Sequence, residues 1–267
     1  MQLCLEFLSR NMPARDRDSV ADQDLVKTAA LALKARRAAK WARAVPLKVF
    51  LNDVLPYRHL DEPYAPWRRA FWDKLAPLVA NATSTVEAAQ IINRDVWALF
   101  ADPPIHFVAD QAPEILSPAQ VIAAGYASCT GLSIFLASAC RAVGVPARVA
   151  GTPSWVDERR DLSQGERFNN HNWVEVWDGA GWSFTGACEY NAAGLNRTWF
   201  FPHPAKSARP GSLMHAIYAA SFEATPGVHF PLAWSPDDTA VPAVDATQAY
   251  LDAEVPPSGA EALPLAS

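Results

Sequence analysis

Apolar side chains recur at helical spacing in the stretch that follows Cys129. They fall at i, i+3, i+4, i+7, i+8 and i+11, which places them on one face of a helix. They are Leu132, Phe135, Leu136, Ala139, Cys140 and Val143. Glycine commonly stands just beyond a helix end, so Gly144 is expected to end this one. The pattern predicts a buried helix that carries Cys129 in its first turn.

Alternating patterns after this helix predict an antiparallel hairpin. The apolar run 145–151 suits a short strand, and in 171–177 two sets of side chains alternate between opposite faces. Asp178 to Gly181 supplies turn residues, so 182–185 should return beside 171–177. One face then holds His171, Trp173, Glu175 and Trp177, and the other holds Asn172, Val174 and Val176. Pairing of Asp178 with Gly181 would set His171 across from Cys188.

The N-terminal third is predicted to be mainly helical. Residues 18–44 favour one long helix, and 84–97 favour a second that begins with the capping-box pattern Ser84-Thr-Val-Glu87. Ser117-Pro-Ala-Gln120 has the same pattern, with proline at the first helical position. The segment between the first two helices contains prolines and aromatic residues, and is expected to be ordered but irregular.

The remaining segments complete the expected organisation. A helix or lid is predicted around Met214, and the Pro- and Ala-rich tail from about Val255 is expected to be disordered. We expect a helical N-terminal region over 1–109, a core over 110–205 and a C-terminal extension over 206–267.

Composition narrows the class of protein. The 267 residues, half of them hydrophobic, can bury a substantial core. The net charge of -5 comes with Lys and Arg interspersed among acids, which argues against a nucleic-acid partner, and no run of about 18 apolar residues indicates a membrane span. Peptides, proteins or small molecules remain as partners, and the oligomeric state is open. The first ten residues lack the features of a secretory signal, so a cytoplasmic location is expected, or export if the chain comes from a longer precursor.

Cysteine and histidine usage points to nucleophilic chemistry rather than to a cofactor. Four cysteines in a chain of this length do not form a disulfide framework, and no Cys or His pair has the spacing of a zinc site. No metal or cofactor is therefore expected. A thiol at a helix start meets unpaired backbone N–H groups, which is expected to lower the pKa of Cys129. His171, 42 residues later on a stiff strand, is positioned to act as its base.

The order of these parts resembles the transglutaminase-like core of the papain-like cysteine enzymes. The resemblance rests on Cys129 and its helix, an Arg-containing strand, the run His171-x-Trp-x-Glu175 and a returning strand that starts with Trp182. It covers roughly residues 110–190. It implies an α+β fold in which the nucleophile helix lies against an antiparallel sheet, with the helical N-terminal region packed on this core.

The same resemblance implies the catalytic roles. In that family a Cys attacks a carboxamide carbon, a His moves the proton, and an Asp after the returning strand orients the His, so Cys129 and His171 match the first two roles. The Asp position falls at or near Gly186, and the nearest carboxylate downstream is Glu189, which could reach back if the chain bulges. Asn170, Asn172 or no charged third member are the alternatives.

Two further sets of site residues are expected. Relatives combine the backbone N–H of the nucleophile with an upstream side-chain donor to bind the oxyanion, and Asn93 and Trp97 are the candidates here. Trp155 and Trp173 are candidates for the wall of the substrate cleft. The loop from Thr152 to Asn170 is expected to form the rim of that cleft.

The resemblance implies an acyl transfer from amide bonds of peptides or proteins through a Cys129 thioester. Hydrolysis is favoured over transamidation, because bacterial-type relatives with this compact core are more often peptidases or amidases than crosslinking enzymes. The alternative is a non-catalytic peptide-binding module: the missing Asp favours it, and the retained Cys129 and His171 argue against it. A papain-type endopeptidase is disfavoured, because its His follows its Cys by about 130 to 150 residues. Nothing in the sequence indicates a calcium loop.

Overall fold

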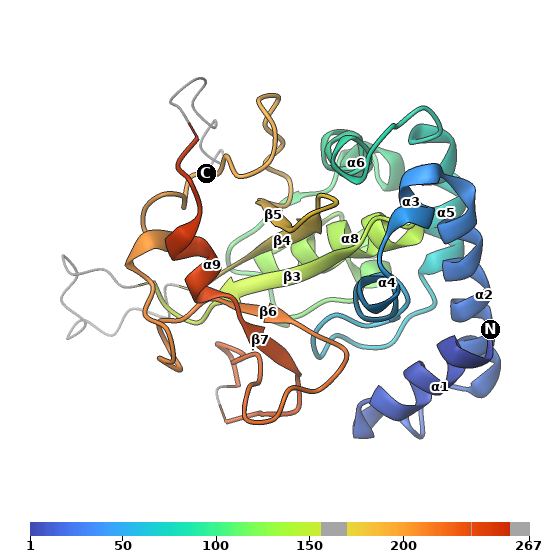
Figure 1. The fold of residues 1–267 in the computed structure, drawn as a ribbon, viewed down its shortest axis with the longest axis horizontal. Helices are drawn as coiled ribbons and strands as arrows, with labels where there is room; N and C mark the ends of the chain where they lie inside the picture. The colour runs from blue at the N-terminus through green and yellow to red at the C-terminus, as the bar shows by residue number, and fades with distance from the viewer. Residues whose placement is uncertain (156–169, 236, 257–267) are drawn as a thin grey trace.

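A computed structural model describes residues 1–155, 170–235 and 237–256 (Figure 1). Most of the predicted rim loop and most of the predicted disordered tail lie outside the described residues. The fold is α+β, as predicted. Its helices are α1 (Gln2–Asn11), α2 (Asp22–Ala38), α3 (Lys40–Ala44), α4 (Leu47–Asp53), α5 (Arg68–Leu78), α6 (Thr85–Phe100), α7 (Pro118–Ala124), α8 (Cys129–Ala142) and α9 (Thr247–Asp252), with 3-10 turns η1 (Ala14–Asp16) and η3 (Ala205–Ser207).

The central element is an antiparallel sheet in the order β5-β4-β3-β6-β7. Its strands are β3 (Ala147–Thr152), β4 (His171–Trp177), β5 (Trp182–Thr185), β6 (Tyr218–Ala220) and β7 (Ala243–Asp245). The predicted hairpin turn is confirmed, because Trp177 pairs with Trp182 and the N–H of Asp178 donates to the carbonyl of Gly181 at 3.0 Å. The ladder ends at Val174 and Thr185, so the expected pairing of His171 with Cys188 does not form. A second, parallel ladder joins β1 (His106–Phe107) to β2 (Tyr126–Ala127) directly before α8.

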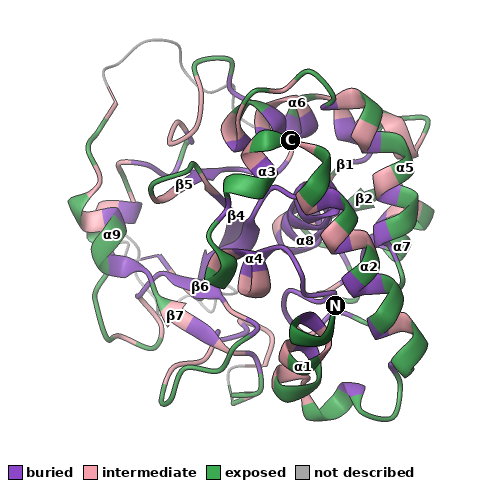
Figure 2. Ribbon diagram, turned by 45° about the vertical axis from the view of Figure 1, so that its right-hand side comes forward, coloured by how far each residue is buried: buried purple, intermediate pink, exposed green. Residues whose placement is uncertain are grey.

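Helix α8 lies across one face of this sheet and is surrounded by other elements (Figure 1). Every residue from Thr130 to Ala142 is buried, because α5, α6 and α7 cover the sides of α8 that the sheet does not. Val149, Val174 and Val176 belong to the same core cluster as the helix. Buried positions accordingly concentrate along α8 and β4 (Figure 2). The predicted packing of the helix that begins at Cys129 against an antiparallel sheet is confirmed.

The opposite face of the sheet has its own core. Alternate residues of β4 point there, and Trp173 packs with Phe184, Phe200 and Tyr250 in a separate cluster. Both faces of β4 are therefore covered, one by α8 and the other by aromatic side chains from the C-terminal half of the chain. Because both faces of β4 are packed, the direction of each side chain on this strand, including His171, is fixed.

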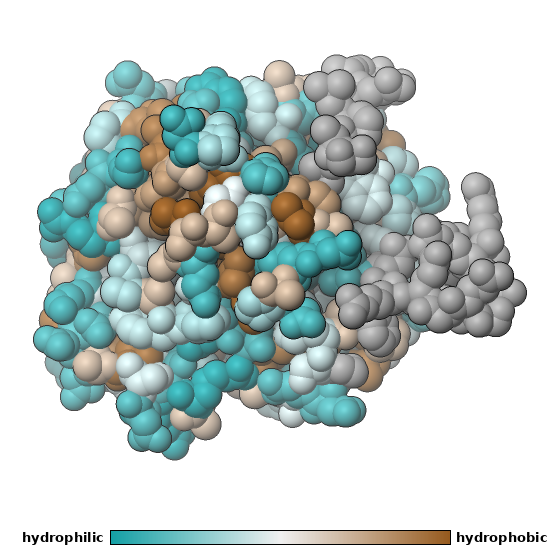
Figure 3. Space-filling view, turned by 180° about the vertical axis from the view of Figure 1, so that it is seen from behind, coloured by the Kyte–Doolittle hydropathy of each residue, from teal (hydrophilic) through white to brown (hydrophobic). Residues whose placement is uncertain are grey.

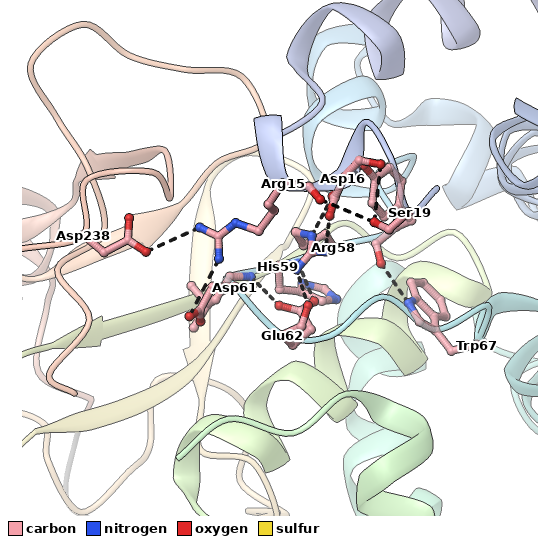
Figure 4. A network of polar contacts seen from close by, with 11 residues as sticks. Arg15, Asp16, Ser19, Arg58, His59, Asp61, Glu62, Trp67 and Asp238 are labelled. Carbon is pink, nitrogen blue, oxygen red and sulfur yellow. Dashed lines mark hydrogen bonds and ion pairs between the residues drawn. The ribbon is translucent and has the colours of Figure 1, made fainter. Parts of the chain in front are cut away.

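Polar contacts tie the N-terminal segments to the rest of the molecule (Figure 4). Arg58 is paired with Asp16, which also accepts a hydrogen bond from the hydroxyl of Tyr57 at 2.8 Å. Arg15 lies 3.9 Å from Asp61 and 3.5 Å from Asp238, so it joins η1 to two segments distant in sequence. Among the described residues, no helix is both long enough and apolar enough to cross a bilayer.

Three local predictions were wrong. The helix expected over 18–44 is two helices, because Ala39 is extended with φ -127° and ψ 153°. The segment expected to be irregular contains α4, which has a complete turn of helix despite the flanking prolines. Around Met214 there is no helix, and the chain enters β6, which pairs with β3. Strands β6 and β7, both in the C-terminal extension, therefore enlarge the central sheet.

Candidate active site

A cavity of about 730 Å³ opens at the amino end of α8. Cys129, His171 and Glu189 all lie in its wall, although they come from α8, β4 and the segment after β5. The wall also contains Gln111, Asn170, Asn172, Trp199 and Trp234. Seen from behind the view of Figure 1, the molecule has a hollowed area where brown apolar groups lie among teal polar ones (Figure 3).

The backbone around Cys129 is fixed by side chains from other segments. Ser128 is the N-cap residue of α8, and its N–H donates to the side-chain oxygen of Gln111 at 2.6 Å. The hydroxyl of Thr130 accepts a hydrogen bond from Nδ2 of Asn172 at 2.7 Å. The first turn of α8 is therefore joined to the start of β4, beside His171.

The pKa of the Cys129 thiol is raised, chiefly by burial. Hydrogen bonds from the N–H of Asn172 and from the hydroxyl and N–H of Thr130 act in the opposite direction, and the nearby charge of Glu189 raises the pKa further. The prediction of a lowered pKa was therefore wrong, because desolvation outweighs the favourable helix terminus. At neutral pH Cys129 rests as a thiol.

His171 is buried among aromatic rings. Its ring centroid lies 4.9 Å from that of Trp199, 5.2 Å from that of Phe200 and 5.7 Å from that of Trp173. Burial lowers the pKa of His171 to about 3, so the imidazole is neutral at physiological pH. Its Nε2 is buried and has no hydrogen-bond partner among the described residues. A neutral imidazole with an open nitrogen can accept a proton.

The carboxyl group of Glu189 occupies the space beside Gly186. A Cβ placed on Gly186 would overlap the carboxyl of Glu189 and would lie 2.9 Å from the Cβ of Glu189. The chain reaches this position by a turn in which the N–H of Glu189 donates to the carbonyl of Gly186 at 3.3 Å and Cys188 is left-handed at φ 64°. Glu189 thus fills the volume that a side chain at position 186 would take.

Glu189 is linked to the imidazole through an indole. Nε1 of Trp199 donates to Oε1 of Glu189 at 3.2 Å, and the same indole ring lies against His171. The structure shows no direct hydrogen bond between Glu189 and His171 among the described residues. Burial raises the pKa of Glu189 to about 7, which the Trp199 hydrogen bond partly offsets.

Residues 74–186 match the family model of the transglutaminase-like superfamily. This segment is a transglutaminase-like core. It begins in α5 and ends directly after β5, so it contains Cys129 and His171 but stops three residues before Glu189.

A comparison with solved structures adds a similarity to a transglutaminase. A transglutaminase from red sea bream is similar with a TM-score of 0.36 and 12% sequence identity, over 68% of this chain and 38% of that enzyme. This chain therefore spans well under half of that transglutaminase. A comparison of the sequence with curated proteins found no match.

Within the transglutaminase-like core, the two predicted oxyanion donors are engaged elsewhere. Nδ2 of Asn93 donates to Oγ1 of Thr185 at 3.1 Å and to the carbonyl of Gly186 at 2.9 Å, which uses both of its hydrogens. The single N–H of Trp97 donates to the carbonyl of Asn93 at 2.6 Å. Neither residue lies in the cavity wall, so this prediction is corrected.

Asn93 instead holds the turn that carries Glu189. Besides its two donated bonds, its Oδ1 accepts a hydrogen bond from the N–H of Cys188 at 3.2 Å. One buried carboxamide on α6 thus bonds to the last residue of β5 and to two residues of the turn that follows it. The position of the Glu189 carboxyl depends on this side chain.

Trp155 and Trp173, predicted as cleft residues, are core residues. Their rings stack at 5.6 Å and 8°, and Nε1 of Trp173 donates to the hydroxyl of Tyr250 at 2.6 Å. The cavity is lined by Trp199 and Trp234 instead. Sequence reasoning missed both, because neither belongs to a periodic pattern.

The Glu of the His-x-Trp-x-Glu run has a structural role. Glu175 accepts from Nε of Arg148 at 2.6 Å and from the hydroxyl of Tyr250 at 2.9 Å. The Arg148 guanidinium also lies 3.9 Å from the ring centroid of Trp182. These contacts lock β3, β4 and β5 in register beneath His171. Over the described residues, no cluster of His, Cys, Asp and Glu is arranged to hold a metal ion.

Proposed function

We propose that this protein is a thiol enzyme that hydrolyses amide bonds of peptides or proteins through a Cys129 thioester. The observation that carries the proposal is the meeting of Cys129 and His171 in the wall of one cavity, within a transglutaminase-like core. Membership of that superfamily makes a cysteine-based enzyme acting on amides possible. The particular reaction is our inference from the site.

The protonation states favour concerted proton transfer over a resting ion pair. A half-buried thiol and a buried neutral imidazole are both uncharged before substrate arrives. As Sγ attacks the amide carbon, His171 takes the thiol proton, and the imidazolium then gives it to the leaving amine. Water next attacks the thioester with His171 as base, which releases the acid and restores the thiol.

Glu189 is the proposed third member of the site. An imidazolium surrounded by aromatic rings is costly, as the low pKa of His171 indicates. A carboxylate one indole away would lessen that cost during turnover, and the Trp199 hydrogen bond holds it there. Glu189 therefore supports the charged intermediate without touching the imidazole.

The test is the rate of iodoacetamide alkylation at each cysteine between pH 6 and 9, read by peptide mass spectrometry. We expect Cys129 to react faster than Cys188, whose pKa burial raises to about 11. His171→Ala should slow Cys129 at least about tenfold at neutral pH, since the base is lost. The exposed His203→Ala is the matched control and should leave the rate unchanged. Equal rates in wild type and His171→Ala would contradict the enzyme proposal.

A peptide-binding module without catalysis is the second candidate. The observation in its favour is the raised pKa of Cys129, together with Gly186 at the family's Asp position. It predicts slow labelling of Cys129 in every variant and peptide binding that Cys129→Ser leaves intact. Hydrolysis and transamidation are separated by supplying a primary amine during turnover of a glutamine peptide, because transamidation would incorporate the amine.

A further inference from the structure

We propose that Gln111 is the side-chain donor that binds the oxyanion when Cys129 attacks. The inference rests on the proposed function and goes beyond it by assigning a group that neither the sequence nor the family match identified. Gln111 lies in the cavity wall, and only 7% of it is exposed. It lies 17 positions before Ser128, the N-cap residue of α8, yet contacts that residue.

The orientation of the Gln111 carboxamide is fixed by two hydrogen bonds. Its oxygen accepts from the N–H of Ser128 at 2.6 Å, and its Nε2 donates to the carbonyl of Pro113 at 2.6 Å. A flipped amide would place donor against donor and acceptor against acceptor, so the assignment is unambiguous. An amide nitrogen carries two hydrogens, and the Pro113 bond uses one. Within the described ranges no other group accepts the second, which is left for a ligand in the cavity.

The amide lies directly against the first turn of α8. A Cβ on Gly131 would stand 3.1 Å from the Gln111 oxygen and 2.7 Å from the Cβ of Ala127, so glycine leaves the space that the carboxamide fills. The first N–H groups of a helix have no intrahelical partner, and this includes that of Cys129. A side-chain N–H of Gln111 and the backbone N–H of Cys129, both without an acceptor among the described residues, therefore belong to the wall of one cavity.

These two donors suit a developing alkoxide. When Sγ adds to an amide carbon, the carbonyl oxygen gains a negative charge that the positive end of α8 and two N–H groups can stabilise. Gln111 needs no rearrangement to do so, because its other bonds already hold it in place. Asn93 and Trp97 have no hydrogen left to donate.

The experiment compares two reactions of the same thiol in full-length protein. p-Nitrophenyl acetate acylates Cys129 through a tetrahedral adduct with an oxyanion, releasing p-nitrophenolate. Iodoacetamide alkylates Cys129 by displacing iodide at a saturated carbon, where no oxyanion forms. Both rates scale with the amount and accessibility of thiolate, so their ratio isolates oxyanion binding. Mass spectrometry of the peptide with Cys129 separates it from the other cysteines.

Gln111→Ala and Gln111→Glu are the test variants. The glutamate keeps an oxygen for the N–H of Ser128, but as a carboxylate at neutral pH it has no hydrogen to donate. We expect both to lower the ratio of acylation to alkylation by about 10- to 1000-fold, the range for loss of one preorganised donor. Alkylation at Cys129 also reports whether the site is still assembled in each variant.

Gln120→Ala is the matched control. Gln120 makes the same contact at α7, where its oxygen accepts from the N–H of Ser117 at 2.8 Å, but it lies outside the cavity wall. Its loss should leave the ratio unchanged. A ratio equal to wild type in both Gln111 variants would overturn the assignment, even if both rates fell together. Absence of both reactions at Cys129 in wild type would instead refute the proposed function itself.

Discussion

The half-buried carboxyl of Glu189 makes the stability of this protein depend on pH in a defined direction. Burial raises its pKa from an ordinary value of 4.5 to about 7. Below pH 4.5 the group is protonated in both the folded and the unfolded chain. Between pH 4.5 and 7 the unfolded chain releases the proton while the folded chain retains it, so the free energy of unfolding falls as the pH rises.

Glu189→Gln removes this titration and keeps the shape and the acceptor for Trp199. One pKa unit corresponds to about 1.4 kcal/mol, so the difference between 4.5 and about 7 corresponds to about 3 kcal/mol. Glu189 is partly exposed, and solvent screening reduces this figure to about 2 kcal/mol. Relative to wild type, Glu189→Gln should therefore gain about 2 kcal/mol between pH 4.5 and pH 8.

The assay is urea unfolding under reducing conditions at pH 5, 6, 7 and 8, followed by tryptophan fluorescence. Subtracting wild type from the variant at each pH cancels the titrations that the two proteins share. In a chain of this size, about 2 kcal/mol would also raise the melting temperature by about 4 to 8 °C at pH 8. The gain should develop mainly between pH 5 and 7.

Glu87→Gln is the control, because its effect on stability should have the opposite sign to that of Glu189→Gln. Glu87 is on the surface, and hydrogen bonds from the hydroxyl and N–H of Thr83 lower its pKa. Its loss should destabilise the protein at neutral pH, and the difference should shrink as the pH falls through the lowered pKa. A difference between Glu189→Gln and wild type that stays constant from pH 5 to 8 would refute the burial argument.

The remaining predictions concern the elements that hold the site. Arg148→Met leaves Glu175 buried without its ion-pair partner, and should cost about 3 to 5 kcal/mol in urea unfolding. Asn93→Ala removes one hydrogen bond to the end of β5 and two to the turn after it, and should speed amide hydrogen exchange at Cys188, whose N–H it holds. Gly186→Asp should displace Glu189 and slow alkylation of Cys129, whereas Gly186→Asp combined with Glu189→Ala should recover most of that rate.

Each of these variants is compared with a control variant or has an outcome that would contradict it. Arg69→Met breaks an exposed ion pair with Asp73 and should change stability by less than about 0.5 kcal/mol. Glu189→Ala alone tests whether the double variant recovers function or merely relieves overlap. Unchanged amide hydrogen exchange at Cys188 in Asn93→Ala would contradict the role of Asn93 in holding the turn. Alkylation of Cys129 as slow in the double variant as in Gly186→Asp would contradict the idea that a carboxyl at position 186 can replace that of Glu189.

The elements around Cys129 could be predicted because their signals are local. The period of α8 and the turn from Asp178 to Gly181 each lie within a few residues, and the turn alone determines the register of β4 with β5. The break at Ala39 and the strand β6 have no such signal. Ala39 lies in a run that favours helix, and β6 is a three-residue strand formed by pairing with β3. Tertiary packing determines both the helix break at Ala39 and the strand β6.

The same distinction separates the site residues. Cys129 and His171 were found from a motif, while Gln111 and Trp199 come from irregular segments whose side-chain directions depend on the completed fold. The start of a helix does act to lower the pKa of Cys129, as the sequence predicts. The sequence does not reveal how much solvent the folded cavity excludes. Desolvation was the larger influence, and it reversed the expected pKa.

The pair Gly186 and Glu189 shows why a missing acid in a motif is weak evidence for an inactive site. Either residue read alone suggests a lost function, because glycine has no carboxyl and the glutamate lies beyond the end of the family match. In the fold they depend on each other: any Cβ at 186 would overlap the carboxyl that the turn through Cys188 brings back. The position of the Glu189 carboxyl thus requires glycine at 186, and the absence of an acid at that position is no argument against the proposed enzyme.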